Sequence, residues 1–190
     1  MATTVEHLAD LLRERDLQFS VDTSGTLPHI LTGFQTRHYR NDEGDLQINL
    51  VIGIYGDGEF VKLFCPGAFK AGPENVAASA LACCVIQWRT PLIQFEIDHS
   101  DGEIRPVVEL PLIDAELTSA QLTYCIDTLL TVVDRFAGVV QHAAEHGEID
   151  FSRYVRPDDE DVTAQQLSNL LSEFTPAQIE RALSLLGLRG

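Results

Sequence analysis

Two stretches within the first 150 residues have apolar side chains at the 3.6-residue period of an amphipathic helix. The first, residues 3–17, opens with Thr3 and Glu6 at the spacing of a capping box. The second, residues 118–147, opens with another capping box and keeps its period until a glycine ends it. The pattern therefore predicts a short N-terminal helix and a long helix near residue 147.

Residues 73–88 are apolar on nearly every side instead of along one stripe. Pro73 suits the first turn of a helix, and Pro91 ends the helix. A helix that is apolar all round is buried on most of its faces. We therefore expect this helix to pack against a sheet on one side and against a partner subunit on another.

Branched and aromatic residues predict three strands between these helices. Residues 30–39 form one strand, which ends at a cluster of turn-forming residues. Residues 46–65 form a hairpin with Asp57 and Gly58 at the centre of its turn, because a type I′ turn requires positive φ at both positions. The three strands together predict an antiparallel meander.

One face of this hairpin is a plain core face, but the opposite face is unusually apolar. The predicted register pairs Tyr55 with Phe60 and Val51 with Phe64, and all four lie on that second face beside Lys62. Such a face is too apolar to be an ordinary solvent-exposed surface. These four residues are therefore the candidate partner-binding site. An equally good alternative is that the first helix or the C-terminal helices cover this face.

Residues 95–112, FEIDHSDGEIRPVVELPL, crowd oxygen and nitrogen ligands around a glycine, as a metal loop would. A calcium loop requires an acidic ligand about six residues after the glycine, where this chain has Val108. A hairpin with residues 101–102 at its turn accounts for the whole segment and places Asp98 opposite Arg105. We therefore predict a second hairpin and no metal site here.

These elements predict an α+β domain in residues 1–150. Its order is a helix, a three-stranded antiparallel meander, a helix, a two-stranded hairpin and a long helix. Residues 151–190 are expected to form a separate tail, with a charged linker at 156–161 followed by two capped helices. Each tail helix is too short to be stable alone, so the pair must fold on itself and dock.

The charge of the chain limits its partners. The 29 acidic and 13 basic side chains give a formal charge of -16, which repels nucleic-acid phosphates and anionic membranes. No run approaches the roughly 20 apolar residues of a spanning helix, and the N-terminal residues are charged, unlike a signal peptide. We expect a cytoplasmic protein with neither nucleic-acid nor membrane partners.

The four cysteines lie outside any C-x-x-C pair, and each is embedded among apolar residues. They are predicted to be small buried hydrophobes in a reducing compartment. There is no G-x-S-x-G nucleophile motif and no phosphate-binding loop. We therefore expect no cofactor and no enzymatic activity. The cysteines are Cys65, Cys83, Cys84 and Cys125.

The segment HAAEH, residues 142–146, is an alternative because it matches the H-x-x-E-H pattern of one class of zinc peptidase. On a helix, His142 and His146 share a face, as two zinc ligands must, and Glu145 would be the general base. The motif lies in the last turn of its helix, however, where histidines also interact favourably with the helix dipole. A metal-dependent hydrolase is therefore a second hypothesis.

The order of elements over residues 3–147 resembles the fold of type III secretion chaperones and of the related YbjN-like domains. Residues 95–122 resemble the section of YbjN-like proteins that runs from an acidic hairpin into the last helix, through the DGEIR turn and the LTSAQL helix start. The tail from about Asp150 lies outside this resemblance. The resemblance implies a small, acidic, non-catalytic domain that dimerises and binds other proteins.

Within this resemblance, secretion chaperones grip extended segments of client proteins on apolar patches, and YbjN-like proteins are described as bacterial regulators. The leading hypothesis is therefore a homodimeric protein-binding module of chaperone-like or regulatory type. Its partner would be a protein or extended peptide bound on the apolar surface. A third hypothesis is a structural or regulatory subunit whose tail helices switch between docked and free states.

Overall fold

The computed structural model describes residues 3–25 and 27–156. The chain divides into two compact units, Met1–Tyr154 and Val155–Gly190, and the fold below is that of the first unit. The two short helices predicted for the tail lie outside the described residues. Among the described residues, no helix is long and apolar enough to span a membrane.

The predicted α+β class is confirmed. Three α-helices and a seven-stranded antiparallel sheet make up the described part of the domain, and two of the strands, β1 and β5, were not predicted. The elements are α1 (Val5–Arg13), β1 (Phe19–Asp22), β2 (His29–Gln35), β3 (Gln47–Tyr55), β4 (Phe60–Phe64), β5 (Phe69–Lys70), α2 (Val76–Arg89), β6 (Ile93–Ile97), β7 (Glu103–Pro111) and α3 (Ser119–His146).

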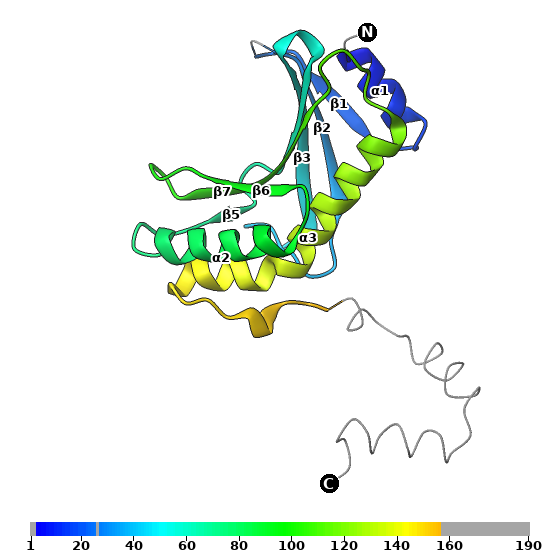
Figure 1. Ribbon diagram of the computed structural model, residues 1–190. Coiled ribbons are helices and arrows are strands. Elements are labelled where there is room, and N and C mark those ends of the chain that lie inside the picture. The colour runs from blue at the N-terminus through cyan, green and yellow to red at the C-terminus, as the bar shows by residue number, and fades with distance from the viewer. Residues whose placement is uncertain (1–2, 26, 157–190) are drawn as a thin grey trace, which may run out of the picture. The chain divides into compact units, whose positions relative to one another are not determined.

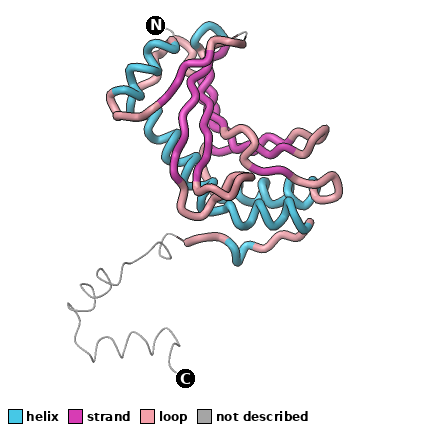
Figure 2. Tube along the Cα trace, turned by 180° about the vertical axis from the view of Figure 1, so that it is seen from behind, coloured by secondary structure: helices cyan, strands magenta, loops and turns pink. Residues whose placement is uncertain are grey.

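Strand β7 joins the two predicted hairpins into one sheet. The strand order is β1-β2-β3-β4-β7-β5, and β6 also pairs with β7. Residues 107–111 of β7 pair with β4, whereas residues 103–108 pair with β5 and β6. The two arms of the sheet meet at an angle there, and the helices lie on the outer side of this bend (Figures 1 and 2). The opposite face of the sheet is consequently open and concave.

The core fills the space between the sheet and the helices. Side chains from α1, α2, α3 and alternate strand positions make one continuous cluster, as expected when each element buries a single apolar face. The largest fully buried side chains are Leu8, Leu12, Ile30, Leu50, Ile52, Leu63, Ile86, Ile104, Leu117, Leu122, Ile126 and Leu129.

The capping box predicted for α3 is confirmed, with both hydrogen bonds between Thr118 and Gln121 present. Gly147 ends the helix with φ of 70°, and its N–H donates to the carbonyl of Ala143 at 3.0 Å. Glycine is suited to this position because a left-handed residue at a helix end suffers no Cβ clash. Both ends of the longest helix are thus encoded locally.

The predicted start of α1 is wrong by one residue. Thr4, not Thr3, is the N-cap, and its side chain accepts from the N–H of His7 at 3.2 Å. The hydroxyl of Thr3 instead accepts from the N–H of Leu117 at 2.8 Å and so ties the N-terminus to the start of α3. The helix ends at Arg13, before the predicted residue 17, because the chain reverses through Asp16 with φ of 55°.

The register predicted for the first hairpin is confirmed, including the pairing of Tyr55 with Phe60 and of Val51 with Phe64. Asp57 and Gly58 have φ of 56° and 95°, as the predicted turn requires. The short helical turn Gly56–Gly58 is formed by this tight reversal.

The register predicted for the second hairpin is wrong by two residues. Arg105 lies opposite Glu96, not opposite Asp98. The loop is longer than two residues because the Asp98 carboxylate turns inward and accepts from both the N–H and the hydroxyl of Ser100, at 2.8 and 2.6 Å. A shift of two residues keeps every side chain on its predicted face.

Candidate functional site

The four candidate residues lie on the face of the sheet that points away from the helices. Val51, Tyr55, Phe60 and Phe64 are each half-buried. The residues that point to the other face of the two strands are buried in the core: Leu50, Ile52, Val61 and Leu63. Helix α1 packs into the core cluster and so lies on the other side of the sheet. Of the two alternative covers predicted for this face, α1 is therefore excluded, and the C-terminal helices lie outside the described residues.

One apolar patch lies at the turn end of the hairpin. The rings of Tyr55 and Phe60 meet edge to face, with centroids 6.4 Å apart. His29 extends the patch, with its Nε2 3.4 Å from the Tyr55 hydroxyl. Gly53 makes room for the rings of Tyr55 and His29, because a Cβ at this position would lie within about 3.0 Å of each ring. We call Tyr55, Phe60 and His29 the aromatic patch.

A second apolar patch lies at the other end of the hairpin, around Phe64 and Val51. The Phe64 ring has the Lys62 ammonium 5.9 Å and the Arg105 guanidinium 5.2 Å from its centroid. Both cations are thus placed for cation–π contact. Val51 and Leu31, which is 38% exposed, line a groove of about 580 Å³ that runs over β1, β2 and β3.

A cluster of four charged side chains separates the two patches. The Lys62 ammonium lies 2.5 Å from Glu96 Oε1 and 3.3 Å from Glu109 Oε1, and Arg105 Nε lies 2.6 Å from Glu96 Oε2. Lys62 is on β4 and Glu96 is on β6, so this ion pair reaches across β7 at the bend of the sheet. We call Lys62, Glu96, Arg105 and Glu109 the bend cluster. The bend cluster divides the apolar surface of the open face into two separate patches.

The ionisation of the bend cluster follows from its contacts. Burial opposes the charge on Glu96, but hydrogen bonds from Lys62 and Arg105 outweigh that effect and lower the pKa of Glu96 below its ordinary value of 4.5. Burial likewise opposes the charge on Lys62, yet the hydrogen bonds that Lys62 donates to Glu96 and Glu109 raise its pKa. Both groups are therefore charged at neutral pH.

Replacing Glu96 with glutamine is expected to lower the free energy of unfolding at pH 7 by about 1 kcal/mol, because two cations lose their shared partner at a half-exposed site. The folded-state pKa is depressed, so the stabilisation by Glu96 is complete above pH 4.5 and is lost as the pH falls further. Urea denaturation at pH 7 and pH 3 measures this difference. A deficit of the same size at both pH values would contradict the ionic role, and the exposed Glu43→Gln serves as control.

The alternative zinc motif retains part of its predicted geometry. His142 and His146 share a face of α3, with ring centroids 4.7 Å apart, and Glu145 lies 3.7 Å from His146. Among the described residues, no group of three His, Cys, Asp or Glu side chains is placed to hold a metal ion. The two histidines of the motif therefore lie together, but the described residues provide no third metal ligand beside them.

One prediction about the cysteines is wrong. Cys65, Cys83 and Cys125 are buried as expected, but Cys84 is exposed on the outer side of α2. Burial raises the pKa of the Cys83 thiol to about 12 and that of Cys125 to about 11, so these two remain protonated at neutral pH. Consecutive side chains on a helix point about 100° apart, so Cys84 faces outward while Cys83 faces the core.

A search of solved structures finds the crystal structure of YbjN from E. coli, a proposed transcription regulator. The match has a TM-score of 0.50 and covers 72% of this chain and 93% of YbjN, at 11% sequence identity. The chain has a YbjN-like fold. No family model matches the sequence, and no curated protein does. At this identity the likeness to YbjN concerns the fold alone, and the relation to secretion chaperones stays a prediction.

Sequence reasoning missed the residues that shape the open face. Gly53 lies in the middle of β3, two residues before Tyr55 and opposite His29 on β2. A glycine in such a position signals that an aromatic ring lies over it. The pairing of Lys62 with Glu96 has no comparable local signal, because it depends on how β7 joins the two hairpins.

Proposed function

We propose that this protein is a non-catalytic binding module that holds an extended segment of a partner protein on the open face of its sheet. The observation that carries this proposal is that half-buried aromatic and aliphatic side chains lie on a concave face that no described helix covers. The YbjN-like fold supports a regulatory or binding role, since YbjN itself is a proposed transcription regulator.

The arrangement of the open face favours an extended ligand. The aromatic patch and the Val51–Phe64 patch are about 13 Å apart along the strand, at roughly 3.3 Å per residue. An extended segment of four or five residues would reach from one patch to the other. Its apolar side chains would occupy the two patches, and a polar residue between them would meet the bend cluster, which carries both signs of charge.

Replacing Phe60 and Phe64 with serine is expected to weaken binding of such segments by at least about tenfold, because each patch loses its main aromatic contact. The probe is a display library of random twelve-residue peptides selected on the wild-type protein, followed by fluorescence anisotropy with the enriched peptides. Circular dichroism verifies that each single variant remains folded.

The matched control for this experiment is Tyr124→Ser, which removes an exposed aromatic ring, 57% accessible, from the helical side of the domain. The control is expected to bind the peptides as the wild type does. Failure to enrich any peptide, or equal binding by the Phe60, Phe64 and Tyr124 variants, would overturn the proposal.

The proposed module acts as a homodimer. An open face on each of two copies would hold two segments of one partner, or one segment from each of two partners, and simultaneous engagement raises the effective affinity.

A further inference from the structure

The open face continues past Phe64 along strand β7. Phe64 lies opposite Val107, where the pairing of β7 with β4 ends and its pairing with β6 carries on. Side chains alternate between the two faces of a strand, so Arg105 and Glu103 point to the same face as Glu109 of the bend cluster. An extended segment that runs from the aromatic patch over Phe64 therefore continues above Arg105 and then above Glu103.

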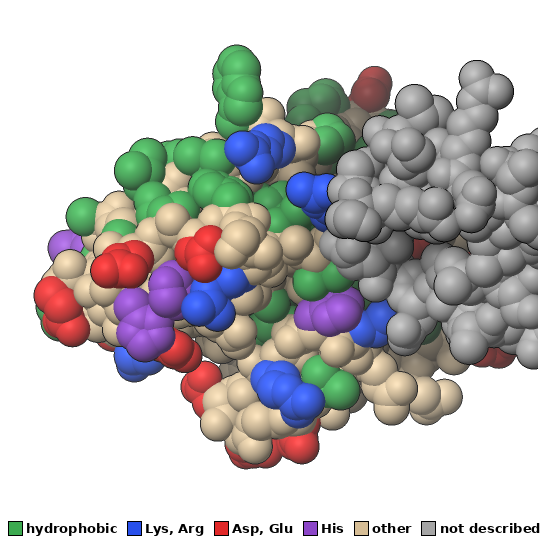
Figure 3. Space-filling view, turned by 90° about the horizontal axis from the view of Figure 1, so that it is seen from below, with side chains coloured by type: hydrophobic (Ala, Val, Ile, Leu, Met, Phe, Trp, Pro, Cys, Tyr) green, Lys and Arg blue, Asp and Glu red, His purple; other side chains and the backbone are tan. Residues whose placement is uncertain are grey.

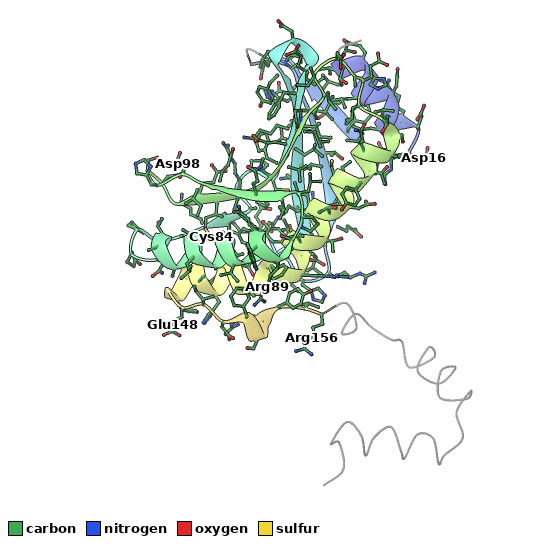
Figure 4. All side chains as sticks on the ribbon, viewed as in Figure 1. Asp16, Cys84, Arg89, Asp98, Glu148 and Arg156 are labelled. Atoms are coloured by element: carbon green, nitrogen blue, oxygen red, sulfur yellow. The ribbon has the colours of Figure 1, made fainter. Side chains whose placement is uncertain are left out.

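A hollow of about 280 Å³ lies at this far end of the open face. Asp98 and Glu103 are cross-strand neighbours there, since the N–H of Asp98 donates to the carbonyl of Glu103 at 2.9 Å. Figure 4 labels Asp98 at the tip of the hairpin of β6 and β7. We call Asp98 and Glu103 the hairpin carboxylates. The hollow is lined by Glu96, Ile97, Asp98, His99, Glu103 and Arg105.

The hollow has a negative charge. Three carboxylates and one guanidinium line it, and this guanidinium, that of Arg105, already contacts Glu96 at 2.6 Å. Lys62 of the bend cluster also contacts Glu96, but Glu109 contacts Lys62 as well and balances its charge. The excess of negative charge therefore belongs to the hairpin carboxylates.

Each hairpin carboxylate uses one oxygen to hold its place in the loop. Asp98 Oδ1 accepts both hydrogen bonds from Ser100, which lower the pKa of Asp98 below its ordinary value of 3.8. Glu103 Oε1 accepts from the N–H of Gly67 at 2.8 Å. Within residues 3–25 and 27–156, no group donates a hydrogen bond to Asp98 Oδ2 or to Glu103 Oε2. Both carboxylates are thus fixed in position and have a second oxygen to offer a cationic ligand.

An apolar segment that carries a basic residue complements both parts of this surface. The formal charge of -16 attracts cations at long range. On the face formed by α2 and the end of α3, Lys, Arg and His side chains lie among the Asp and Glu side chains (Figure 3). In the hollow, by contrast, carboxylates outnumber the cation three to one. The Phe64 patch adjoins the hollow through Arg105, whose guanidinium lies 5.2 Å from the Phe64 ring centroid.

We propose that the partner segment of the open face is basic, with a lysine or arginine bound by Asp98 and Glu103 while an apolar residue of the same segment covers Phe64. This inference rests on the proposed function and states the chemistry of its partner. Val107, opposite Phe64, and Glu103 are four residues apart on β7, which is about 13 Å at roughly 3.3 Å per residue. A basic residue about three to five positions from the apolar one therefore reaches the hairpin carboxylates.

The peptides selected on the wild-type protein provide the first test. We expect most enriched sequences to carry Lys or Arg about three to five positions from an apolar residue. Norleucine in place of that lysine, or citrulline in place of that arginine, keeps the length of the side chain and removes its charge. Either replacement should raise the dissociation constant about tenfold. Enriched peptides that lack a basic residue at this spacing, yet bind the Phe60 and Phe64 variants weakly, would overturn this inference and leave the proposed function intact.

The double variant Asp98→Asn, Glu103→Gln provides the second test. Both amides retain an oxygen to accept from Ser100 and Gly67, so the hairpin keeps its hydrogen bonds while the hollow loses two charges. The variant is expected to bind a lysine-containing peptide about tenfold more weakly than the wild type and with less dependence on salt. It should bind the norleucine form of that peptide as the wild type does. An equal loss for the two forms would show that the lysine does not bind at the hairpin carboxylates.

The matched control is the double variant Glu14→Gln, Glu148→Gln, which removes the same number of charges from two exposed positions. Figure 4 shows Glu148 on the helical side of the domain, away from Asp98. The control should bind the lysine-containing peptide within about twofold of the wild type, because distant exposed charges are screened by salt. Equal weakening by the two double variants would assign the effect to net charge and would overturn the inference.

Discussion

Replacing Gly102 with alanine is expected to lower the free energy of unfolding by about 3 kcal/mol, the largest loss among the single substitutions considered. Gly102 ends the loop between β6 and β7 with φ of 80°, a conformation that disfavours any Cβ. A Cβ there would lie 2.0 Å from the carbonyl oxygen of Ala71, which is far inside contact distance. The Ala71 N–H donates to the Gly102 carbonyl at 2.9 Å, so this loop cannot move away without losing its link to β5.

The matched control for Gly102 is Gly44, which has φ of 86° and nothing within 4 Å of a hypothetical Cβ. Gly44→Ala retains the conformational cost but not the clash, and is expected to cost about 1 kcal/mol. Chemical denaturation followed by circular dichroism measures both. Equal losses of unfolding free energy for the two variants would show that the close approach to Ala71 adds nothing to the cost of a Cβ at position 102.

Replacing Asp134 with alanine is expected to cost about 2.5 kcal/mol, the second-largest loss. Asp134 lies in the middle of α3, and its Oδ1 accepts from the backbone N–H groups of Arg37, His38 and Tyr39 at 3.0, 2.8 and 2.9 Å. This one carboxylate thus fastens the connection after β2 to the long helix. Without this carboxylate the three N–H groups would need water as acceptor, and the loop is only partly exposed to water.

Asp134→Asn is the conservative comparison, because it keeps an acceptor oxygen in place while removing the charge. We expect it to cost about 1 kcal/mol, less than half the loss for alanine. Hydrogen exchange of residues 37–39 should speed up in the alanine variant and change little in the asparagine variant. The same exchange rates in both variants would contradict the role of Oδ1.

Local patterns predicted those parts of the fold that depend on neighbouring residues. The two hydrogen bonds between Thr118 and Gln121 and the left-handed Gly147 mark both ends of α3, and each depends on a few consecutive residues. The turn at Asp57 and Gly58 set the register of the first hairpin for the same reason. That register identified the half-buried face that carries the proposed binding site.

Prediction failed where a local side-chain bond replaced the expected pairing, and where distant contacts competed with local patterns. Asp98 turns toward Ser100 instead of toward Arg105, because a side-chain bond within the loop displaces the expected cross-strand pair. Thr3 has the correct spacing to cap α1, but its hydroxyl accepts from Leu117, 114 positions away. Strands β1 and β5 are short, so their partners in the sheet define them more than their own sequences do.

Sequence alone determined the α+β class, the order of the main helices and hairpins, and the side of each strand that faces the core, because periodicity and turn chemistry are local properties. Only the tertiary structure decided that β7 pairs with both β4 and β6, and that the sheet bends there. The ion pair between Lys62 and Glu96 depends on that bend, because β7 brings the strands of the two residues together. Such features arise from contacts between segments far apart in the chain, which no short pattern of residues encodes.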